Sequence, residues 1–266
     1  MFNSLVANTN VMMNKRQIQI TELLHRDGSV RVKELSEIFN VSQETIRRDL
    51  ALLEKNGFLK RIHGGAVLKE RKQGLEIPVL FRAQKNIEEK KMIGKKAASF
   101  INDGDIIAID ASTTGLELTK HIKNKNITVI TNSIPVSLEL LSCENITVIL
   151  IGGYLSKESV SLVGNFSESV LKDYHVDKFF FSCNGINFER GISEIHEEQA
   201  LVKRVLISIS DQLILIADHS KFGVKSLFRL CNITDIDCLI TDNKVALEEI
   251  REINKMGIET YIANDK

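Results

Sequence analysis

The sequence lacks the long hydrophobic runs that a membrane protein needs. No stretch of 18 or more consecutive residues is apolar, so no transmembrane helix is predicted. The first 14 residues have neither a basic segment nor an apolar core of signal-peptide length. Internal repeats and low-complexity tracts are also lacking, which argues against an array architecture. We therefore expect a protein that stays in the cytoplasm and has no membrane partner.

Cysteine and histidine are few and scattered. The four cysteines form no C-x-x-C pair, and the six histidines show no metal-ligand spacing. The sequence therefore predicts no metal site and no cofactor, and the thiols are expected to be free in a reducing compartment. The cysteines are Cys143, Cys183, Cys231 and Cys238.

Net charge is zero over the 266 residues, so the chain as a whole gives no indication of a nucleic-acid partner. With 43% hydrophobic and 26% charged residues, the composition is that of a globular protein, and dominant disorder is excluded. The charge is unevenly distributed. Residues 15–72 hold 13 Lys and Arg against 8 Asp and Glu, a net charge of +5, which leaves −5 on the remainder. A DNA contact would need such a basic excess.

The hydrophobic pattern changes once along the chain. Three short amphipathic helices and a hairpin signal come first, and apolar strands alternating with helix-length segments follow. The stretch between them, residues 69–78, is charged and weakly periodic, which is typical of a linker. The predicted parts are an N-terminal extension (1–14), a small helical domain (15–70), a linker (71–85) and a larger domain (86–266).

The larger domain is predicted to be α/β, with a mainly parallel sheet covered by helices on both faces. Apolar strand candidates alternate with helix-length segments, as expected for such a fold. The strand candidates are 105–109, 127–131, 146–151, 178–183, 212–217 and 238–241, and the helix candidates include 114–122, 134–141, 197–208 and 244–256. Ligands of such sheets bind at the carboxyl ends of the strands.

The small domain has the spacing of a helix-turn-helix. Apolar residues recur at helical spacing in residues 16–25 and 32–39, and Gly28 is expected to end the first helix. Asn40, which tolerates positive φ, is expected to form the tight turn, and Ser42 is placed to cap a third helix. This pattern predicts the helix-turn-helix motif.

Helix three presents polar side chains opposite its apolar face. Ile46, Leu50 and Leu53 define that buried face, so the polar residues of the N-terminal half are exposed, where a recognition helix enters the major groove. A solvated helix face explains Arg47 and Arg48 equally well when they are taken alone. The predicted DNA-binding residues of this helix are Ser42, Gln43, Glu44, Thr45, Arg47 and Arg48.

A basic wing is predicted after the third helix. Gly57 is expected to end that helix, and residues 59–62 and 66–68 are predicted to pair as a hairpin through a Gly64-Gly65 turn. A wing of this kind lies along the DNA backbone or in the minor groove, where it contributes salt-sensitive affinity. Its predicted DNA-binding residues are Lys60, Arg61 and His63.

These motifs resemble the signature of the DeoR family of transcription regulators. The resemblance lies in V-S-Q-E-T-I-R-R-D-L at residues 41–50, then Leu53, Gly57, Leu59, Arg61 and H-G-G-A at residues 63–66. It implies a winged helix that binds double-stranded operator DNA, most simply as a repressor. In that pattern Asp49 is expected to orient Arg48 or to cap a neighbouring group, since a carboxylate is repelled by DNA.

The resemblance continues from Arg16 to the end of the larger domain. Arg82, Asn86 and Lys90 precede Ile93 in the family's spacing, and D-A-S-T-T-G at residues 110–115 looks like its phosphate-facing loop. It implies a sensor domain similar to the ribose-phosphate isomerase and CoA-transferase fold, and a phosphorylated sugar that releases the protein from its operator.

Loops after the predicted strands give an independent physical reason for an anion site. Small hydroxylated residues between a strand and a helix present N–H groups and hydroxyls to an anion, although ordinary helix capping explains Ser112, Thr113 and Thr114 as well. Several such loops can converge at one edge of the sheet. The predicted effector-binding residues are Asp110, Ser112, Thr113, Thr114, Thr131, Asn132, Gly152, Gly153, Asn184, Gly185, Glu198, Lys203, Asp218 and Lys221.

Alternatives stay open for several of these residues. Glu198 and Lys203 could equally be solvated helix charges, and their spacing does not favour a pair. Cys183 is interpreted as a small buried hydrophobe and His219 as a structural or ligand-contact residue. Ser112 and Gln199 stand where the family often has Gly and Glu, and both substitutions could alter which sugar is accepted.

Three functions compete. The first is a sugar-phosphate-responsive regulator, which needs at least a homodimer, or a homotetramer, to read paired half-sites. The second is an isomerase that uses Asp110 or Asp218 with Lys221 to move protons. The third is an architectural DNA-binding protein without an effector. The winged helix favours a regulator over an enzyme, and the polar loops favour a sensor over an architectural protein.

Overall fold

The structure is a computed structural model that describes residues 15–55, 58–67 and 79–264. The chain divides into two compact units, Met1–Leu75 and Glu76–Lys266. The predicted N-terminal extension, the expected helix stop at Gly57 and most of the predicted linker lie outside the described residues. Within the described part of the chain, no helix is both long enough and apolar enough to cross a membrane.

The first unit packs three helices around a small apolar core. Ile20 and Leu24 of the first helix, Leu35 of the second, and Ile46 and Leu50 of the third are all buried. Asn40 has a φ of 50° in the turn before the third helix, and Ser42 Oγ accepts a hydrogen bond from Thr45 N at 3.2 Å. The predicted helix-turn-helix is therefore confirmed. Its helices are α2 (Lys15–Asp27), α3 (Val32–Ile38) and α4 (Gln43–Lys55).

The wing is a three-stranded antiparallel sheet in the order β1-β3-β2, rather than an isolated hairpin. Its strands are β1 (Ser29–Arg31), β2 (Lys60–Ile62) and β3 (Gly65–Val67). Ile62 pairs with Gly65, so the predicted Gly64-Gly65 turn is wrong and the two loop residues are His63 and Gly64, with Gly64 at a φ of 77°. A Cβ on Gly65 would lie 2.1 Å from Val30 O. Gly65 therefore allows β1 to approach rather than forming the turn.

The second unit is built on a seven-stranded sheet in the order β15-β14-β12-β9-β4-β5-β6. Every neighbouring pair in it is parallel, as predicted for the larger domain. Near-continuous apolar sequences such as those of β9 and β12 are typical of strands buried on both faces. The strands are β4 (Ile106–Ile109), β5 (Ile127–Thr131), β6 (Ile146–Leu150), β9 (Val176–Phe181), β12 (Ser210–Ile216), β14 (Cys238–Asp242) and β15 (Glu259–Ala263).

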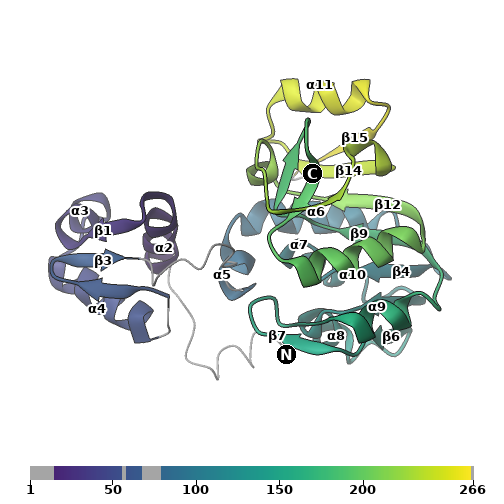
Figure 1. The fold of residues 1–266 in the computed structure, drawn as a ribbon, viewed down its shortest axis with the longest axis horizontal. Coiled ribbons are helices and arrows are strands. Elements are labelled where there is room, and N and C mark those ends of the chain that lie inside the picture. The colour runs from purple at the N-terminus through teal and green to yellow at the C-terminus, as the bar shows by residue number, and fades with distance from the viewer. Residues whose placement is uncertain (1–14, 56–57, 68–78, 265–266) are drawn as a thin grey trace. The chain divides into compact units, whose positions relative to one another are not determined.

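Helices cover both faces of this sheet. In Figure 1, α10 lies in front of it and α6 behind it. Three buried phenylalanines, Phe179, Phe180 and Phe181, give β9 apolar contacts on both sides. The helices are α5 (Val79–Gln84), α6 (Ile87–Ala98), α7 (Thr113–Thr119), α8 (Ile134–Leu140), α9 (Asn165–Leu171), α10 (Glu197–Ser208) and α11 (Leu247–Lys255), with 3-10 turns η1 (His219–Lys221) and η2 (Ile233–Asp235).

Two small antiparallel sheets, neither of them predicted, follow the carboxyl ends of the central strands. One pairs β7 (Tyr154–Ser156) with β8 (Ser161–Val163) after β6. The other has the order β10-β11-β13 and begins directly after β9. Its strands are β10 (Gly185–Asn187), β11 (Gly191–Glu194) and β13 (Phe228–Cys231). Both additions bring further residues toward the end of the sheet where a ligand is expected.

Candidate DNA-binding face and candidate effector site

The polar side of α4 is exposed along its N-terminal half. Ser42, Gln43, Glu44, Arg47 and Arg48 are exposed, while Thr45 is half-buried. The opposite side, formed by Ile46, Leu50 and Leu53, is buried, as the periodicity predicts. Together with Lys60, Arg61 and His63 of the wing, these polar residues define the candidate DNA face.

Two arginines of the DNA face make weak contacts within their own helix. Glu44 lies 3.6 Å from both Arg47 Nη1 and Arg48 Nε, and Arg47 Nη2 donates to Gln43 Oε1 at 3.2 Å. The Arg48 side chain is 81% exposed. Exposed pairs of this kind contribute about 0–1 kcal/mol, so both guanidinium groups can exchange these partners for DNA.

Asp49 joins α4 to the first helix. The carboxylate is buried and accepts from Arg16 Nε at 2.6 Å and from Gln17 Nε2 at 2.7 Å. Of the two roles expected for Asp49, orienting Arg48 is wrong, whereas binding a neighbouring group agrees with these contacts. Its partners come from α2, more than 30 residues earlier, and helical spacing within α4 cannot indicate them.

The wing is anchored to α4 through Arg61. Its backbone N–H donates to Glu54 Oε1 at 2.8 Å, and its Nε donates to Glu54 Oε2 at 2.6 Å. The backbone hydrogen bond, followed by the side-chain bond and the guanidinium charge, lowers the pKa of Glu54. Lys60 and His63 are exposed beside Arg61.

The candidate effector site lies at the carboxyl ends of five adjacent strands. In the sheet order β12-β9-β4-β5-β6, each strand is followed by a loop that contains predicted site residues. The chain runs outward from β4 to β6 and then returns to β9 on the other side of β4. The boundary between β4 and β9 is therefore the topological switch point, where ligands of open α/β sheets bind.

The loop after β4 uses its side chains for local structure. Ser112 Oγ accepts from Gly115 N at 2.9 Å, so Ser112 is the N-cap of α7, and Thr113 Oγ1 donates to Arg82 O at 3.4 Å. A Cβ on Gly115 would lie 2.8 Å from Ile109 Cγ2 and 3.2 Å from Asp110 Oδ1. A side chain at position 115, in the first turn of α7, would therefore crowd Ile109 and Asp110.

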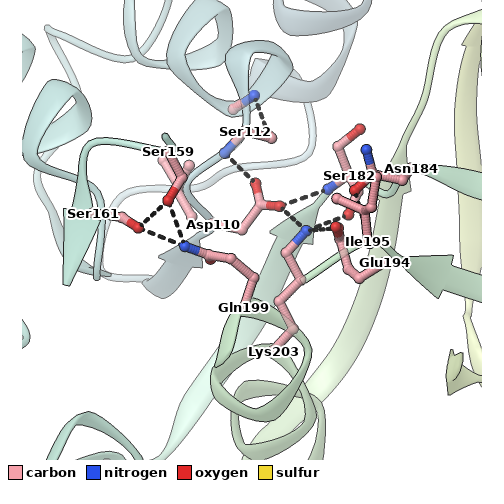
Figure 2. A network of polar contacts seen from close by, with 12 residues as sticks. Asp110, Ser112, Ser159, Ser161, Ser182, Asn184, Glu194, Ile195, Gln199 and Lys203 are labelled. Atoms are coloured by element: carbon pink, nitrogen blue, oxygen red, sulfur yellow. Dashed lines mark hydrogen bonds and ion pairs between the residues drawn. The ribbon is translucent and has the colours of Figure 1, made fainter. Parts of the chain in front are cut away.

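A buried ion network links this loop to the neighbouring strand and to α10 (Figure 2). Asp110 Oδ2 lies 2.8 Å from Lys203 Nζ and accepts from Ser182 N at 3.0 Å. Lys203 also donates to Ser182 O at 2.8 Å and contacts the Glu194 carboxylate. Burial lowers the pKa of Lys203, but Asp110 and Glu194 outweigh burial and raise it above its ordinary value.

These contacts settle one open alternative. Lys203 is 5% exposed, so its interpretation as a solvated helix charge is wrong. Its partners are Asp110, Glu194 and Ser182, all outside α10. Glu198 is exposed, and both of its interpretations stay open.

Gln199, one turn before Lys203, joins α10 to the loop between β7 and β8. Its Nε2 donates to Ser159 Oγ at 2.8 Å and to Ser161 Oγ at 2.5 Å (Figure 2). Val160 between these serines has a φ of 49°, which is uncommon for a β-branched residue. Such strain persists where surrounding contacts fix the backbone. A Glu at 199 would accept from the same hydroxyls, whereas Gln donates to them.

The loops after β5, β6 and β9 make mainly structural contacts. Thr131 Oγ1 donates to Ile109 O at 2.7 Å, and Asn132 Nδ2 donates to Leu162 O at 3.0 Å. Asn184 Oδ1 accepts from Ile195 N at 3.3 Å. The predicted glycines fit close backbone approaches: a Cβ on Gly153 would lie 2.5 Å from Val163 O, and one on Gly185 would lie 2.4 Å from Val224 O. Gly152 faces the Phe166 ring.

Asp218 and Lys221 lie in the loop after β12. Asp218 is 1% exposed, and its Oδ1 accepts from Asn86 Nδ2 at 2.8 Å and from Ser220 Oγ at 2.5 Å. Burial raises the pKa of Asp218, but Lys221, Ser220, Lys90 and Asn86 lower it, and their effect prevails. Lys221 is half-buried.

Two residues from outside the predicted loops, Lys90 and Asn86, act on Asp218 and help to position it. The resemblance names them, but strand and loop patterns could not place helix residues beside Asp218. Lys90 is 4% exposed, and burial lowers its pKa to about 7 despite the attraction of Asp218, with Lys221 lowering it further.

Cys183 and His219 have structural surroundings. Burial raises the pKa of the Cys183 thiol to about 12, which supports its interpretation as a small buried hydrophobe. His219 N donates to Asp242 Oδ2 at 2.8 Å, and its Nδ1 lies 3.1 Å from Asp242 Oδ1. The side chain therefore helps to attach η1 to the end of β14.

Two family models match this chain, the DeoR-like helix-turn-helix domain over residues 16–72 and the DeoR C terminal sensor domain over residues 85–243. The uncharacterized HTH-type transcriptional regulator YulB of Bacillus subtilis is 44% identical over 88% of this chain and 90% of its own length. The HTH-type transcriptional repressor GlcR of the same organism is 39% identical over 93% and 95%. The lactose phosphotransferase system repressor of Staphylococcus epidermidis is 35% identical over 94% and 98%.

Among solved structures, ribose 5 phosphate isomerase A from Neisseria gonorrhoeae is 16% identical to this chain, with a TM-score of 0.39, and the match covers 51% of this chain and 53% of that one. The family models cover both units, and the relatives are similar over nearly their whole length. The chain therefore belongs to the DeoR family of helix-turn-helix transcriptional regulators.

Proposed function

We propose that this protein is a cytoplasmic repressor of a sugar-metabolism operon that a phosphorylated sugar releases from its operator. The observation that carries the proposal is the cationic group around Asp218, joined in one chain to a winged helix. The names of two relatives agree with it, the putative aga operon transcriptional repressor of Escherichia coli and the lactose phosphotransferase system repressor of Staphylococcus epidermidis.

The charges around Asp218 favour an anionic ligand. Lys90 and Lys221 both lie close enough to affect the carboxylate, and Arg82 and Lys85 add positive charge around Lys90. Two lysines, Lys90 and Lys221, thus act on the single carboxylate of Asp218. An anion such as a phosphate group would offset the excess, and the sugar hydroxyls would then face the neighbouring loops.

The ion network of Asp110 and Lys203 has a different role in this proposal. Lysine has three donor hydrogens, and Lys203 already contacts Asp110, Glu194 and Ser182 O. We infer that Lys203 positions the loops after β4 and β9 and does not bind the sugar directly.

The same contacts favour a sensor over an isomerase. A general base needs a carboxylate oxygen that can reach the substrate's proton. Both oxygens of Asp110 accept from backbone N–H groups, those of Ser112 and Ser182. Asp218 is 1% exposed, and its Oδ1 accepts from Asn86 and Ser220. We infer that the protein is not an enzyme.

We also infer that the protein acts as a homodimer or homotetramer. One small winged helix contacts too little DNA for high specificity, so at least two are needed.

A thermal-shift panel of pentose and hexose phosphates tests the effector class. At least one compound should raise Tm, while the corresponding unphosphorylated sugars should not. Lys221→Ala should lose that response, and Lys225→Ala, which removes an exposed lysine paired with Glu189, should keep it. Steady turnover of any compound would favour the isomerase, and a panel without any stabilisation would overturn the proposed effector class.

A further inference from the structure

The α5–α6 junction, residues 82–86, is bound to the candidate effector site by polar contacts. α5 is the first described helix of the second unit and follows residues 68–78, which connect the two units in sequence. Lys90 Nζ donates to the carbonyl oxygens of Arg82 and Lys85, and Thr113 Oγ1 also donates to Arg82 O. The carboxyl end of α5 is therefore held by Lys90 from α6 and by the loop after β4.

Asn86 ties the same junction to the loop after β12. It occupies the N-cap position of α6 with a φ of 51°, yet its side chain makes no capping bond to that helix. Instead, Asn86 Nδ2 donates to Asp218 Oδ1 at 2.8 Å across 132 residues of sequence. Asparagine is a favoured N-cap residue, so its use for a distant carboxylate links the junction to η1 instead of stabilising its own helix.

The groups that hold the junction are also the groups that an anion would engage. Asp218 attracts both Lys90 and Lys221, which repel each other. A phosphate beside Lys221 would repel the Asp218 carboxylate and compete with it for the two lysines. Phosphate oxygens are also stronger acceptors than a carbonyl, so a phosphate that reaches Thr113 would compete with Arg82 O for its hydroxyl.

We propose that the α5–α6 junction transmits effector binding: an anion bound at η1 weakens the Asn86–Asp218 and Thr113–Arg82 bonds and frees α5 to move. This inference rests on the proposed function, which supplies a sugar phosphate as the anion. Asn86 and Lys90 are then positioning residues that act through the junction. α5 is the first described helix of the second unit, so its release frees the described beginning of that unit.

Amide hydrogen exchange on the full chain tests the junction without knowledge of the operator. The probes are pentose phosphates, hexose phosphates and inorganic phosphate, each first ranked by its effect on Tm. With a stabilising compound, exchange in residues 79–90 should become about fivefold faster, the factor expected for losing one average hydrogen bond. Residues 165–171 of α9 should not change.

The matched variants separate transmission from binding. Asn86→Gly keeps a backbone that tolerates positive φ but removes the bond to Asp218. In this variant, residues 79–90 should already exchange fast without ligand. Adding the compound should change their exchange rate by less than about twofold, while the same compound still raises Tm. Asn124→Gly changes an exposed turn residue and should behave like the wild type.

Two results would overturn the inference while leaving the proposed function in place. One is a sugar phosphate that raises Tm but leaves residues 79–90 unchanged in the wild type. The other is an Asn86→Gly variant whose junction responds as the wild type does. If no compound raises Tm, the proposed effector class fails and the transmission fails with it.

Discussion

The DNA face and the candidate effector site hold their functional side chains in opposite ways. On α4, Arg47 and Arg48 are exposed and contact residues one turn away at distances up to 3.6 Å. At the carboxyl ends of the strands, Asp110, Lys203 and Asp218 are buried and bind groups from several elements.

The difference teaches how each region can work. An exposed arginine with weak partners can be mutated without affecting the rest of its unit, and DNA can take the place of those partners. A buried lysine between two carboxylates fixes the loops around it, so its loss affects the whole sensor unit. The predictions below test this contrast, beginning with the buried network.

Lys203→Met should lower the free energy of unfolding of the sensor unit by about 3–5 kcal/mol, because Asp110 and Glu194 would stay buried without their counter-ion. Urea denaturation at constant pH measures the loss. Glu198→Gln, an exposed change on the same helix, should stay within about 0.5 kcal/mol of the wild type. Equal effects of the two variants would contradict the contrast.

Arg48→Ala should weaken binding to specific DNA by about 1–3 kcal/mol and relax sequence preference, as expected for a base contact. Arg61→Ala should weaken specific and random DNA alike, because a wing contacts the backbone. Fluorescence anisotropy with a duplex selected by the wild type, and with a random duplex, measures both. If Arg48→Ala weakened the two duplexes equally, α4 would not be the reading element.

Lys90 should make stability depend on pH. Its pKa is about 7 in the folded protein, against 10.5 for the ordinary side chain, so the unfolded chain binds more protons between these values. Stability relative to Lys90→Met should therefore rise with pH from about 7 toward 10, by at most about 1.4 kcal/mol per pH unit. The charged groups Asp218, Lys221, Arg82 and Lys85 affect this titration.

Urea denaturation of both proteins across that pH range gives the comparison. Lys91→Met, which removes the next residue, an exposed lysine, serves as the control. Its stability curve should run parallel to that of the wild type above neutral pH, up to the pH at which Lys91 of the wild type titrates. If the wild-type stability curve ran parallel to that of Lys90→Met, the pKa of Lys90 would not be lowered in the folded protein, and the prediction would be wrong.

Glu44→Gln should have the smallest effect on stability, less than about 0.5 kcal/mol, because its ion pairs are exposed. Removal of the carboxylate leaves Arg47 and Arg48 more positive, so affinity for all DNA should rise and depend more strongly on salt. Thermal unfolding and a salt titration of binding test both. A loss confined to specific DNA would instead assign a base contact to Glu44.

Much of the fold could be predicted because regular periodicity identifies its larger elements. The helix at residues 197–208 has the predicted boundaries, and each of the six apolar strand candidates overlaps a strand of the parallel sheet. β15 was not predicted, since Glu259–Ala263 is a half-buried edge strand without a continuous apolar run. β1, β7, β8 and β10 have three residues each, too few for a pattern.

Less of the candidate site could be predicted, because its geometry depends on contacts between distant residues. Sequence patterns placed Asp110 and Asp218 after strands and Lys203 on a helix, but they could not show that Lys203 contacts two carboxylates. Asn86 and Asp218 are 132 residues apart, so no local pattern pairs them. Local capping interactions were easier to predict from the sequence, as the N-cap at Ser112 illustrates.

Operator affinity measured with and without a stabilising sugar phosphate tests the central claim most directly. Fluorescence anisotropy on a duplex selected by the wild type should show a roughly 5-fold to 150-fold loss of affinity, the usual range of allosteric coupling. Lys221→Ala should keep its DNA affinity and lose the response, while Lys225→Ala should respond normally. Unchanged operator affinity in the presence of a sugar phosphate that raises the Tm of the same protein would contradict the account.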